Sequence, residues 1–75
     1  MEFDYSKLLG RIKEFGLTQK TLAKKIGTTL STLNLKLNNK YAFSMKEIGA
    51  ICKVLDIPKR EIGIYFFDEK VQKAE

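Results

Sequence analysis

Residues 18–40 read TQKTLAKKIGTTLSTLNLKLNNK, a stretch without acidic residues. Two short segments with apolar residues at helical spacing meet in it at Gly27. No acidic residue occurs between Glu14 and Glu47, whereas lysines recur at Lys20, Lys24, Lys25, Lys36 and Lys40. A basic pair of helices that is also rich in Ser, Thr, Asn and Gln suits the phosphates and base edges of duplex DNA.

The charge is unevenly distributed along the chain. Residues 1–40 hold eight Lys and Arg against three Asp and Glu, whereas residues 41–75 hold six of each. The net charge of +5 therefore lies on the half that contains the paired helices. The length of 75 residues, of which 44% are hydrophobic and 31% charged, predicts one globular domain. We place this domain at residues 1–67, followed by a charged, flexible tail at residues 68–75.

The residue types that catalysis needs are scarce. The sequence has no histidine and contains neither a cluster of metal-ligand residues nor a glycine-rich phosphate loop. The single cysteine, Cys52, lies on an apolar helical face and is predicted to be a small core residue. We therefore expect no enzyme activity, no cofactor, no metal and no small-molecule ligand. Without a long apolar run, a signal-peptide pattern or a cysteine pair, the chain is expected to be cytoplasmic and not bound to a membrane.

Start and stop signals predict five helices. The first begins after Asp4 as its N-cap, and the second begins after Thr18. The second helix ends at Gly27, which can adopt the positive φ needed for a sharp turn. The third helix covers about residues 30–37 and has Thr29 as its cap.

The second half of the chain supplies two further helices. Residues 44–47, Ser-Met-Lys-Glu, form a capping box that starts the fourth helix. Pro58 suits the first turn of the fifth. The expected fold is all-α, a compact five-helix domain with a helix-turn-helix at helices two and three.

The spacing of small and apolar residues in the first half matches a DNA-binding helix-turn-helix; the matching positions are Gln19, Ala23, Gly27 and Leu33. An ordinary helical hairpin could also place Ala and Gly there. With residues 17–33 followed by Asn38-Asn39-Lys40, the chain resembles the Cro and repressor helix-turn-helix family of temperate phages and bacterial regulators. The resemblance covers about residues 5–66. It implies a lambda-repressor-like domain that binds operator DNA through the major groove, usually as a dimer, and the small size is more like Cro.

One position departs from that family's pattern. Lys36 stands where relatives carry an apolar residue, and Leu37 follows where several carry a polar one. We infer that Leu37 contacts Ile12 of the first helix in place of an ion pair, and that the end of the third helix is slightly rotated.

The third helix is expected to read DNA bases. At ~100° per residue, Leu30, Leu33 and Leu37 turn inward, and the opposite face holds Ser31, Asn34, Leu35 and Asn38. Asn34 is the best candidate for base reading, because an amide can pair bidentately with adenine. Leu35 suits a thymine methyl, or alternatively packs against a partner subunit or the fourth helix.

Phosphate contacts are expected from helix termini and from the turn after the third helix. Gln19 lies where free backbone N–H groups favour an anion, and the family resemblance gives it the same role. Thr29 suits either an N-cap or a phosphate donor, and Lys36 is expected to extend its ammonium toward phosphate. Lys20, Lys24 and Lys25 suit a solvated surface equally well. The complete predicted DNA-contacting set is Gln19, Thr29, Ser31, Asn34, Leu35, Lys36, Asn38, Asn39 and Lys40.

The last apolar residues are expected to mediate a homodimer. The predicted interface consists of Ile62, Ile64, Phe66 and Phe67, together more apolar surface than one short helix can bury. The alternative is that these residues all cap the core of the monomer.

The sequence therefore predicts a sequence-specific regulator of transcription that binds double-stranded operator DNA, a Cro-like repressor. An alternative is a protein-interaction module, antitoxin-like or anti-repressor. The outward Leu35 and the apolar end of the chain favour this alternative, whereas the acid-free helix pair argues against it. A third reading is a nucleoid-type or RNA-binding protein with little sequence preference. The polar face with Ser31 and Asn34 argues against it.

Overall fold

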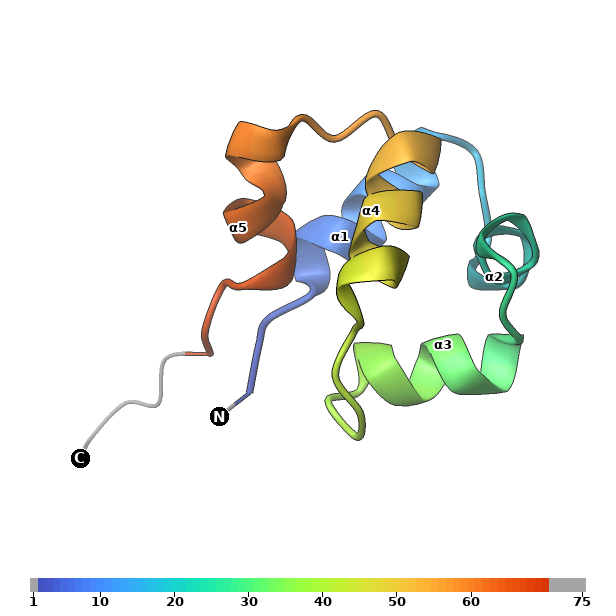
Figure 1. The fold of residues 1–75 in the computed structure, drawn as a ribbon, viewed down its shortest axis with the longest axis horizontal. Coiled ribbons are helices and arrows are strands. Elements are labelled where there is room, and N and C mark those ends of the chain that lie inside the picture. Colours follow the sequence, from blue (N-terminus) through green and yellow to red (C-terminus); the bar gives the residue numbers. More distant parts are fainter. Residues whose placement is uncertain (1, 71–75) are drawn as a thin grey trace.

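The computed structural model describes residues 2–70, which form five α-helices and one 3-10 turn. α1 (Ser6–Glu14) and α5 (Ile62–Phe66) pack together beside α4 (Met45–Val54), as Figure 1 shows. α2 (Gln19–Ile26) lies at the opposite edge, and α3 (Leu30–Leu37) runs along the bottom of the view. The predicted all-α, five-helix fold is confirmed. No helix within residues 2–70 is long and apolar enough to cross a bilayer.

Short-range side-chain hydrogen bonds start three of the helices as predicted. Thr18 accepts the Thr21 N–H at 3.1 Å, while the Thr18 N–H donates to the Thr21 hydroxyl at 2.8 Å. Thr29 accepts the Thr32 N–H at 3.1 Å, and Ser44 accepts the Glu47 N–H at 3.1 Å. Gly27 ends α2 at φ 82°, a left-handed conformation that glycine adopts without strain, so only three residues separate α2 from α3.

Two predicted helix starts need correction. Tyr5, not Asp4, immediately precedes α1, and Asp4 Oδ1 accepts the Ser6 N–H at 2.9 Å from one residue further back. Pro58 does not open α5 directly, because a 3-10 turn, η1 (Lys59–Glu61), lies between them. Pro58 itself is extended, at φ −71° and ψ 155°, so the helix starts only at Ile62.

One hydrophobic core joins the helices. Ala23 is buried in it, which supplies the small side chain expected where α2 meets its neighbours. The largest fully buried side chains are Leu8, Leu22, Leu33, Ile51, Leu55 and Phe66. The core therefore takes members from all five helices.

Phe66 belongs to this core and not to a dimer interface, which corrects its predicted role. Its side chain is 1% exposed and meets Phe43 edge to face, with ring centroids 5.5 Å apart. Phe43 in turn meets Tyr5 at 5.4 Å. Because α5 has only five residues, one large anchor must hold it against α1, and Phe66 occupies that place.

The domain continues beyond the predicted boundary at residue 67. Phe3 and Glu69 form an antiparallel bridge, in which the Asp4 N–H donates to the Asp68 carbonyl and the Lys70 N–H to the Glu2 carbonyl. Residues 68–70 are therefore paired with residues 2–4. Residues 71–75 of the predicted tail lie outside the described residues.

Phe66→Ala is expected to lower the free energy of unfolding by about 3–5 kcal/mol, because it leaves a cavity in a closed core. The matched control is Phe67→Ala, since Phe67 is 51% exposed and should cost only about 1–2 kcal/mol. Urea unfolding at two protein concentrations checks this. If Phe66→Ala lowers the free energy of unfolding only at the higher protein concentration, Phe66 would instead lie in a subunit interface.

Candidate nucleic-acid interface

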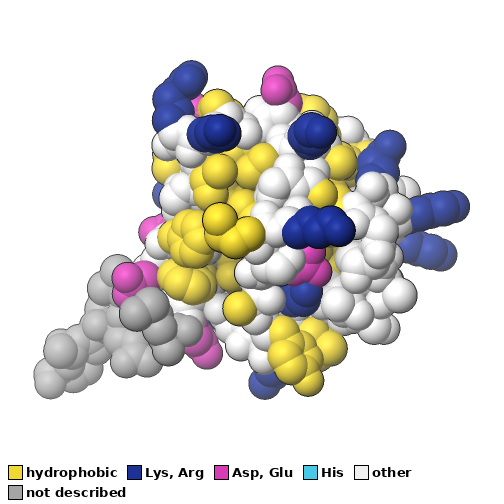
Figure 2. Space-filling model, viewed as in Figure 1, with side chains coloured by type: hydrophobic (Ala, Val, Ile, Leu, Met, Phe, Trp, Pro, Cys, Tyr) yellow, Lys and Arg dark blue, Asp and Glu magenta, His cyan; other side chains and the backbone are white. Residues whose placement is uncertain are grey.

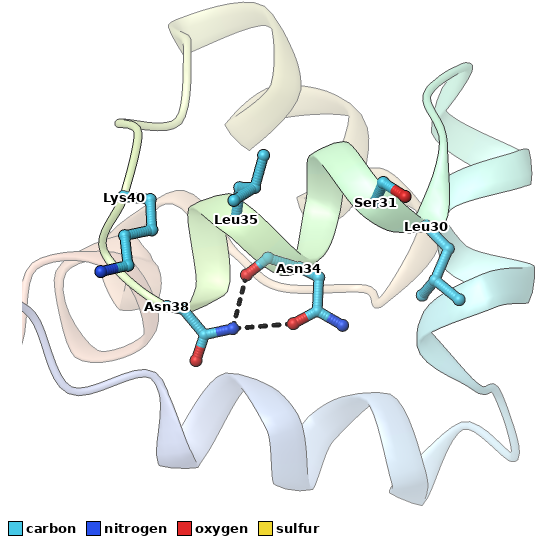
Figure 3. Close-up of a pocket in the computed structure, with 6 residues that line it drawn as sticks. All are labelled: Leu30, Ser31, Asn34, Leu35, Asn38 and Lys40. Carbon is cyan, nitrogen blue, oxygen red and sulfur yellow. Dashed lines mark hydrogen bonds between the residues drawn. The ribbon is translucent and has the colours of Figure 1, made fainter.

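The outward face of α3 lines a shallow depression, which Figure 3 shows from the front. The residues around it are Leu30, Ser31, Asn34, Leu35, Asn38 and Lys40, and all six are exposed. Five of them belong to the predicted DNA-contacting set, so the structure brings together most of the predicted reading face. We call these six residues the α3 face.

Leu30 was expected to point inward, and this is wrong. It is 40% exposed, whereas Thr32 and Lys36 on the other side of the helix are half-buried. The buried side of α3 is therefore centred between Leu33 and Lys36 and not between Leu33 and Leu30. This placement adds Leu30 to the α3 face.

Lys36 does not extend toward phosphate, which corrects its predicted contact. Its ammonium pairs with Glu47 in the first turn of α4, and only 15% of its side chain is exposed. A half-buried cation needs a counter-charge, and Glu47 is the first acidic residue after Glu14 in the chain. The ion pair thereby explains how a lysine occupies a position that is apolar in the resembled family.

Glu47 uses its two carboxylate oxygens for two different tasks. Oε1 accepts the Ser44 N–H at 2.8 Å, completing the predicted capping box of α4, while Oε2 accepts from the Lys36 ammonium. Burial of the carboxylate acts to raise its pKa, but the hydrogen bonds from Lys36 and Ser44 outweigh burial, so the pKa of Glu47 is lowered. The charged form of Glu47 is therefore the one that the fold stabilises.

Asn39 was also expected to contact the DNA backbone, but its side chain is used inside the protein. Its Oδ1 accepts the Phe3 N–H at 2.9 Å, and its Nδ2 donates to the Phe3 carbonyl at 3.0 Å. The amide thus pairs with Phe3 as a neighbouring strand would, on the edge opposite Glu69. Asn39 has φ 63°, a conformation that Asn tolerates better than most residues. We call this arrangement of residues 2–4, residues 68–70 and Asn39 the terminal clasp.

Asn34 and Asn38 contact each other on the α3 face. The Asn38 Nδ2 donates to the Asn34 Oδ1 at 2.7 Å and to the Asn34 backbone carbonyl at 2.9 Å (Figure 3). Both side chains remain exposed, so each still offers polar atoms to a ligand.

The remaining predicted contacts lie at the ends of α2 and α3. Gln19 is the first residue of α2 and is half-buried. Thr29 caps α3 through the hydroxyl that was also considered as a phosphate donor, and this hydroxyl in addition donates to Thr32 Oγ1 at 3.0 Å. Lysine side chains project from the edge of the molecule formed by α2, as Figure 2 shows. Lys20, Lys24 and Lys25 are all exposed there.

A separate apolar area lies over α5, visible as the yellow patch on the left of Figure 2. Ile64 and Phe67 are 47% and 51% exposed, whereas Ile62 is partly buried against the core. Of the four predicted dimer contacts, Ile64 and Phe67 therefore present the most free surface, and Phe66 presents none.

Comparison with known proteins bears on this site. Residues 1–69 match the family described as "Protein of unknown function (DUF739)". The chain belongs to this family. Its structure is similar to the solution structure of the modulator of repression (MOR) of the temperate bacteriophage TP901-1 from Lactococcus lactis, with a TM-score of 0.78. The sequences are 40% identical, and the match covers 96% of this chain and 97% of that chain. A comparison with curated proteins gave no match.

This DUF739 protein is thus a homologue of a small phage regulator that modulates repression, which agrees with the predicted class of protein at the coarse level. Reasoning from the sequence missed the exposed position of Leu30 and the internal partners of Lys36 and Asn39. One signal was present: Glu47 ends an acid-free stretch and, at the third position of a helix, can reach a lysine on the preceding helix.

The lowered pKa of Glu47 predicts a stability that depends on pH. Its contribution should be complete above the ordinary pKa of 4.5 and should be lost as the pH falls through the lower pKa of the folded state. Urea unfolding between about pH 7 and about pH 3 checks this, because Glu47→Gln should flatten the acid-induced loss. The matched control is Glu14→Gln, since the Glu14 carboxylate is largely exposed beside Arg11. An unchanged acid response in Glu47→Gln would contradict the assignment.

Proposed function

We propose that this DUF739 protein acts in a phage-type repression switch by binding operator DNA through the α3 face, as a Cro-like, sequence-specific regulator. The observation that carries the proposal is the gathering of Ser31, Asn34 and Asn38, three exposed hydrogen-bonding side chains, on one side of a helix that follows a tight turn. A helix presented in this way fits the major groove, where base edges offer donors and acceptors.

The charge of the surrounding surface supports the proposal. Lys40 lies at the end of the α3 face, and the three lysines of α2 are exposed near its beginning. The described residues between Glu14 and Glu47 bring no carboxylate to this region, and Glu47 itself is paired with Lys36. An approaching duplex would therefore meet uncompensated cations along α2 and at Lys40, just after the end of α3.

A second candidate function is binding of a protein partner through the same α3 face. Leu30 and Leu35 are 40% and 41% exposed there, which is unusual for a face that contacts only bases and phosphates. The similar phage protein is itself named as a modulator of repression and not as a repressor. On this candidate the protein would alter repression by covering another regulator and not by occupying an operator.

Salt dependence separates the two candidates. With roughly four to eight phosphate contacts per dimer, log K for duplex DNA should fall against log salt with a slope of roughly −4 to −7. Gel shifts with DNA from the gene's own neighbourhood, compared with random duplex over a salt series, measure the slope. A slope near zero, or no shift at all, would reject DNA binding and favour the protein partner.

Two lysines at the end of the helix-turn-helix provide a matched pair of substitutions. Lys40→Ala should weaken binding to operator and random duplex by similar factors and reduce the salt slope of a dimer by about 2, one phosphate contact per chain, because Lys40 is exposed at the end of the α3 face. Lys36→Met should leave the slope unchanged and lower the stability, because its ammonium is held by Glu47. The same salt series and urea unfolding test both variants. If Lys36→Met reduced the salt slope as much as Lys40→Ala does, Lys36 would have to leave Glu47 and contact phosphate.

We also propose that the protein pairs through the exposed part of α5, because one helix-turn-helix reads too few base pairs to select an operator. Ile64→Asp should abolish pairing and reduce affinity for a palindromic site, while leaving the fold intact at this half-exposed position. Sedimentation with and without the palindromic duplex tests this, and Lys59→Asp on the exposed η1 is the matched control. A complex of one chain on the full site would rule the dimer out.

A further inference from the structure

The orientation of the Asn34 amide on the α3 face is set by its neighbour Asn38. Asn38 lies one helical turn beyond Asn34, and its amide contacts two atoms of Asn34 at once, the backbone carbonyl at 2.9 Å and the side-chain Oδ1 at 2.7 Å. The pair lies at the middle of the exposed depression, where Figure 3 shows both side chains directed away from the helix.

The backbone carbonyl decides which atoms face each other. A carbonyl oxygen can only accept a hydrogen bond, so the atom of Asn38 beside it must be the donor Nδ2. The Asn34 atom that meets the same Nδ2 must then be its acceptor, Oδ1. The Asn34 Nδ2 is thereby turned away from Asn38, and the Asn38 Oδ1 is turned away from Asn34, as Figure 3 shows.

This orientation changes what Asn34 offers to a ligand. One lone pair of its Oδ1 is taken by Asn38, while its Nδ2 points away from Asn38 and has no hydrogen-bond partner among the described residues, so it is free to donate to a ligand. A bidentate pair with adenine needs the amide oxygen to accept from N6 and the amide nitrogen to donate to N7. A guanine presents two acceptors in the major groove, N7 and O6, which match an outward amide nitrogen.

We propose that Asn38 is a specificity-determining positioning residue that fixes Asn34 as a hydrogen-bond donor, so that the α3 face reads a guanine edge and not an adenine edge. This inference rests on the proposed binding of operator DNA and specifies which base the central residue of that site selects. It replaces the adenine pairing expected from the residue type of Asn34 alone.

Asn38→Asp provides the sharpest test, because a carboxylate can only accept. It would draw the Asn34 Nδ2 toward itself and turn the Asn34 Oδ1 outward, which favours the N6 donor of adenine or the N4 donor of cytosine. The added negative charge weakens binding to every duplex alike. The informative quantity is therefore the ratio of affinities for two duplexes that differ at one base pair.

The experiment begins with selection of duplexes from a randomised pool by the wild-type protein. Single-pair variants of the selected site, including one with 7-deazaguanine, are then measured against wild type, Asn38→Asp, Asn34→Ala and the matched control Lys53→Ala, an exposed position on α4 outside the α3 face. Asn34→Ala identifies the base pair that Asn34 reads. Wild type and Lys53→Ala should prefer guanine over adenine at that base pair by roughly tenfold, and 7-deazaguanine should remove much of that preference. Asn38→Asp should reduce the ratio by roughly tenfold or invert it.

The possible failures are distinct. A wild-type preference for adenine at the pair that Asn34→Ala relaxes, or an unchanged ratio in Asn38→Asp, overturns this inference and leaves DNA binding intact. Selection of no duplex over random DNA overturns the proposed function together with this inference. Circular dichroism and thermal unfolding of Asn38→Asp confirm that the exposed substitution has not unfolded the domain.

Discussion

The carboxylate of Glu47 holds two helices in place at once. One oxygen closes the first turn of α4, and the other receives the ammonium of Lys36 from α3. A negative charge at the start of a helix also interacts favourably with the positive end of the helix dipole. The capping box and the ion pair therefore both stabilise the ionised form of Glu47. Together with the burial of Leu33 and the packing of α3 against α2, this ion pair fixes the rotation of α3 about its own axis.

That rotation divides the side chains of α3 into two sets. Leu33 and Lys36 face the protein, while the α3 face, from Leu30 to Lys40, is directed to solvent. The charge of Lys36 is used to hold the helix and not to attract a ligand. In the proposed DNA complex, recognition would depend on a central pair of amides with leucines nearby, and attraction of phosphates would depend on Lys40 and the lysines of α2. This arrangement suits selection of a partner more than strong binding to any anionic surface.

Sequence reasoning succeeded for most contacts between residues that are close in the chain, although it misplaced the starts of α1 and α5 and the side chain of Leu30. The caps at Thr18, Thr29 and Ser44 and the turn at Gly27 arise within four positions of their partners, so residue type and spacing were sufficient to predict them. Most of the α3 face followed from helical periodicity for the same reason.

Other errors arose where a side chain finds its partner far along the chain. Lys36 reaches 11 positions to Glu47, and Asn39 reaches 36 positions to Phe3. The spacing of these two residues does not distinguish an internal partner from a phosphate, and only the position of Glu47 after the acid-free stretch pointed to a partner for Lys36. Phe66 was misplaced because a single sequence gives the number of apolar residues near α5 but not which of them faces α1.

The terminal clasp has a consequence for the order in which the domain assembles. It joins three segments whose positions in the chain are as far apart as the fold allows, near residues 3, 39 and 69. Closing such large loops costs more chain entropy than joining α2 to its neighbours α3 and α4, so the clasp should form late in folding, together with the pairing of α1 and α5. During synthesis on the ribosome, the Phe3 edge that pairs with residues 68–70 must wait for the final part of the domain to emerge, whereas α2 can already pack on α3 and α4. The pairing of Phe3 on both of its edges, with Asn39 on one and residues 68–70 on the other, would then be complete only when the last paired residue leaves the exit tunnel.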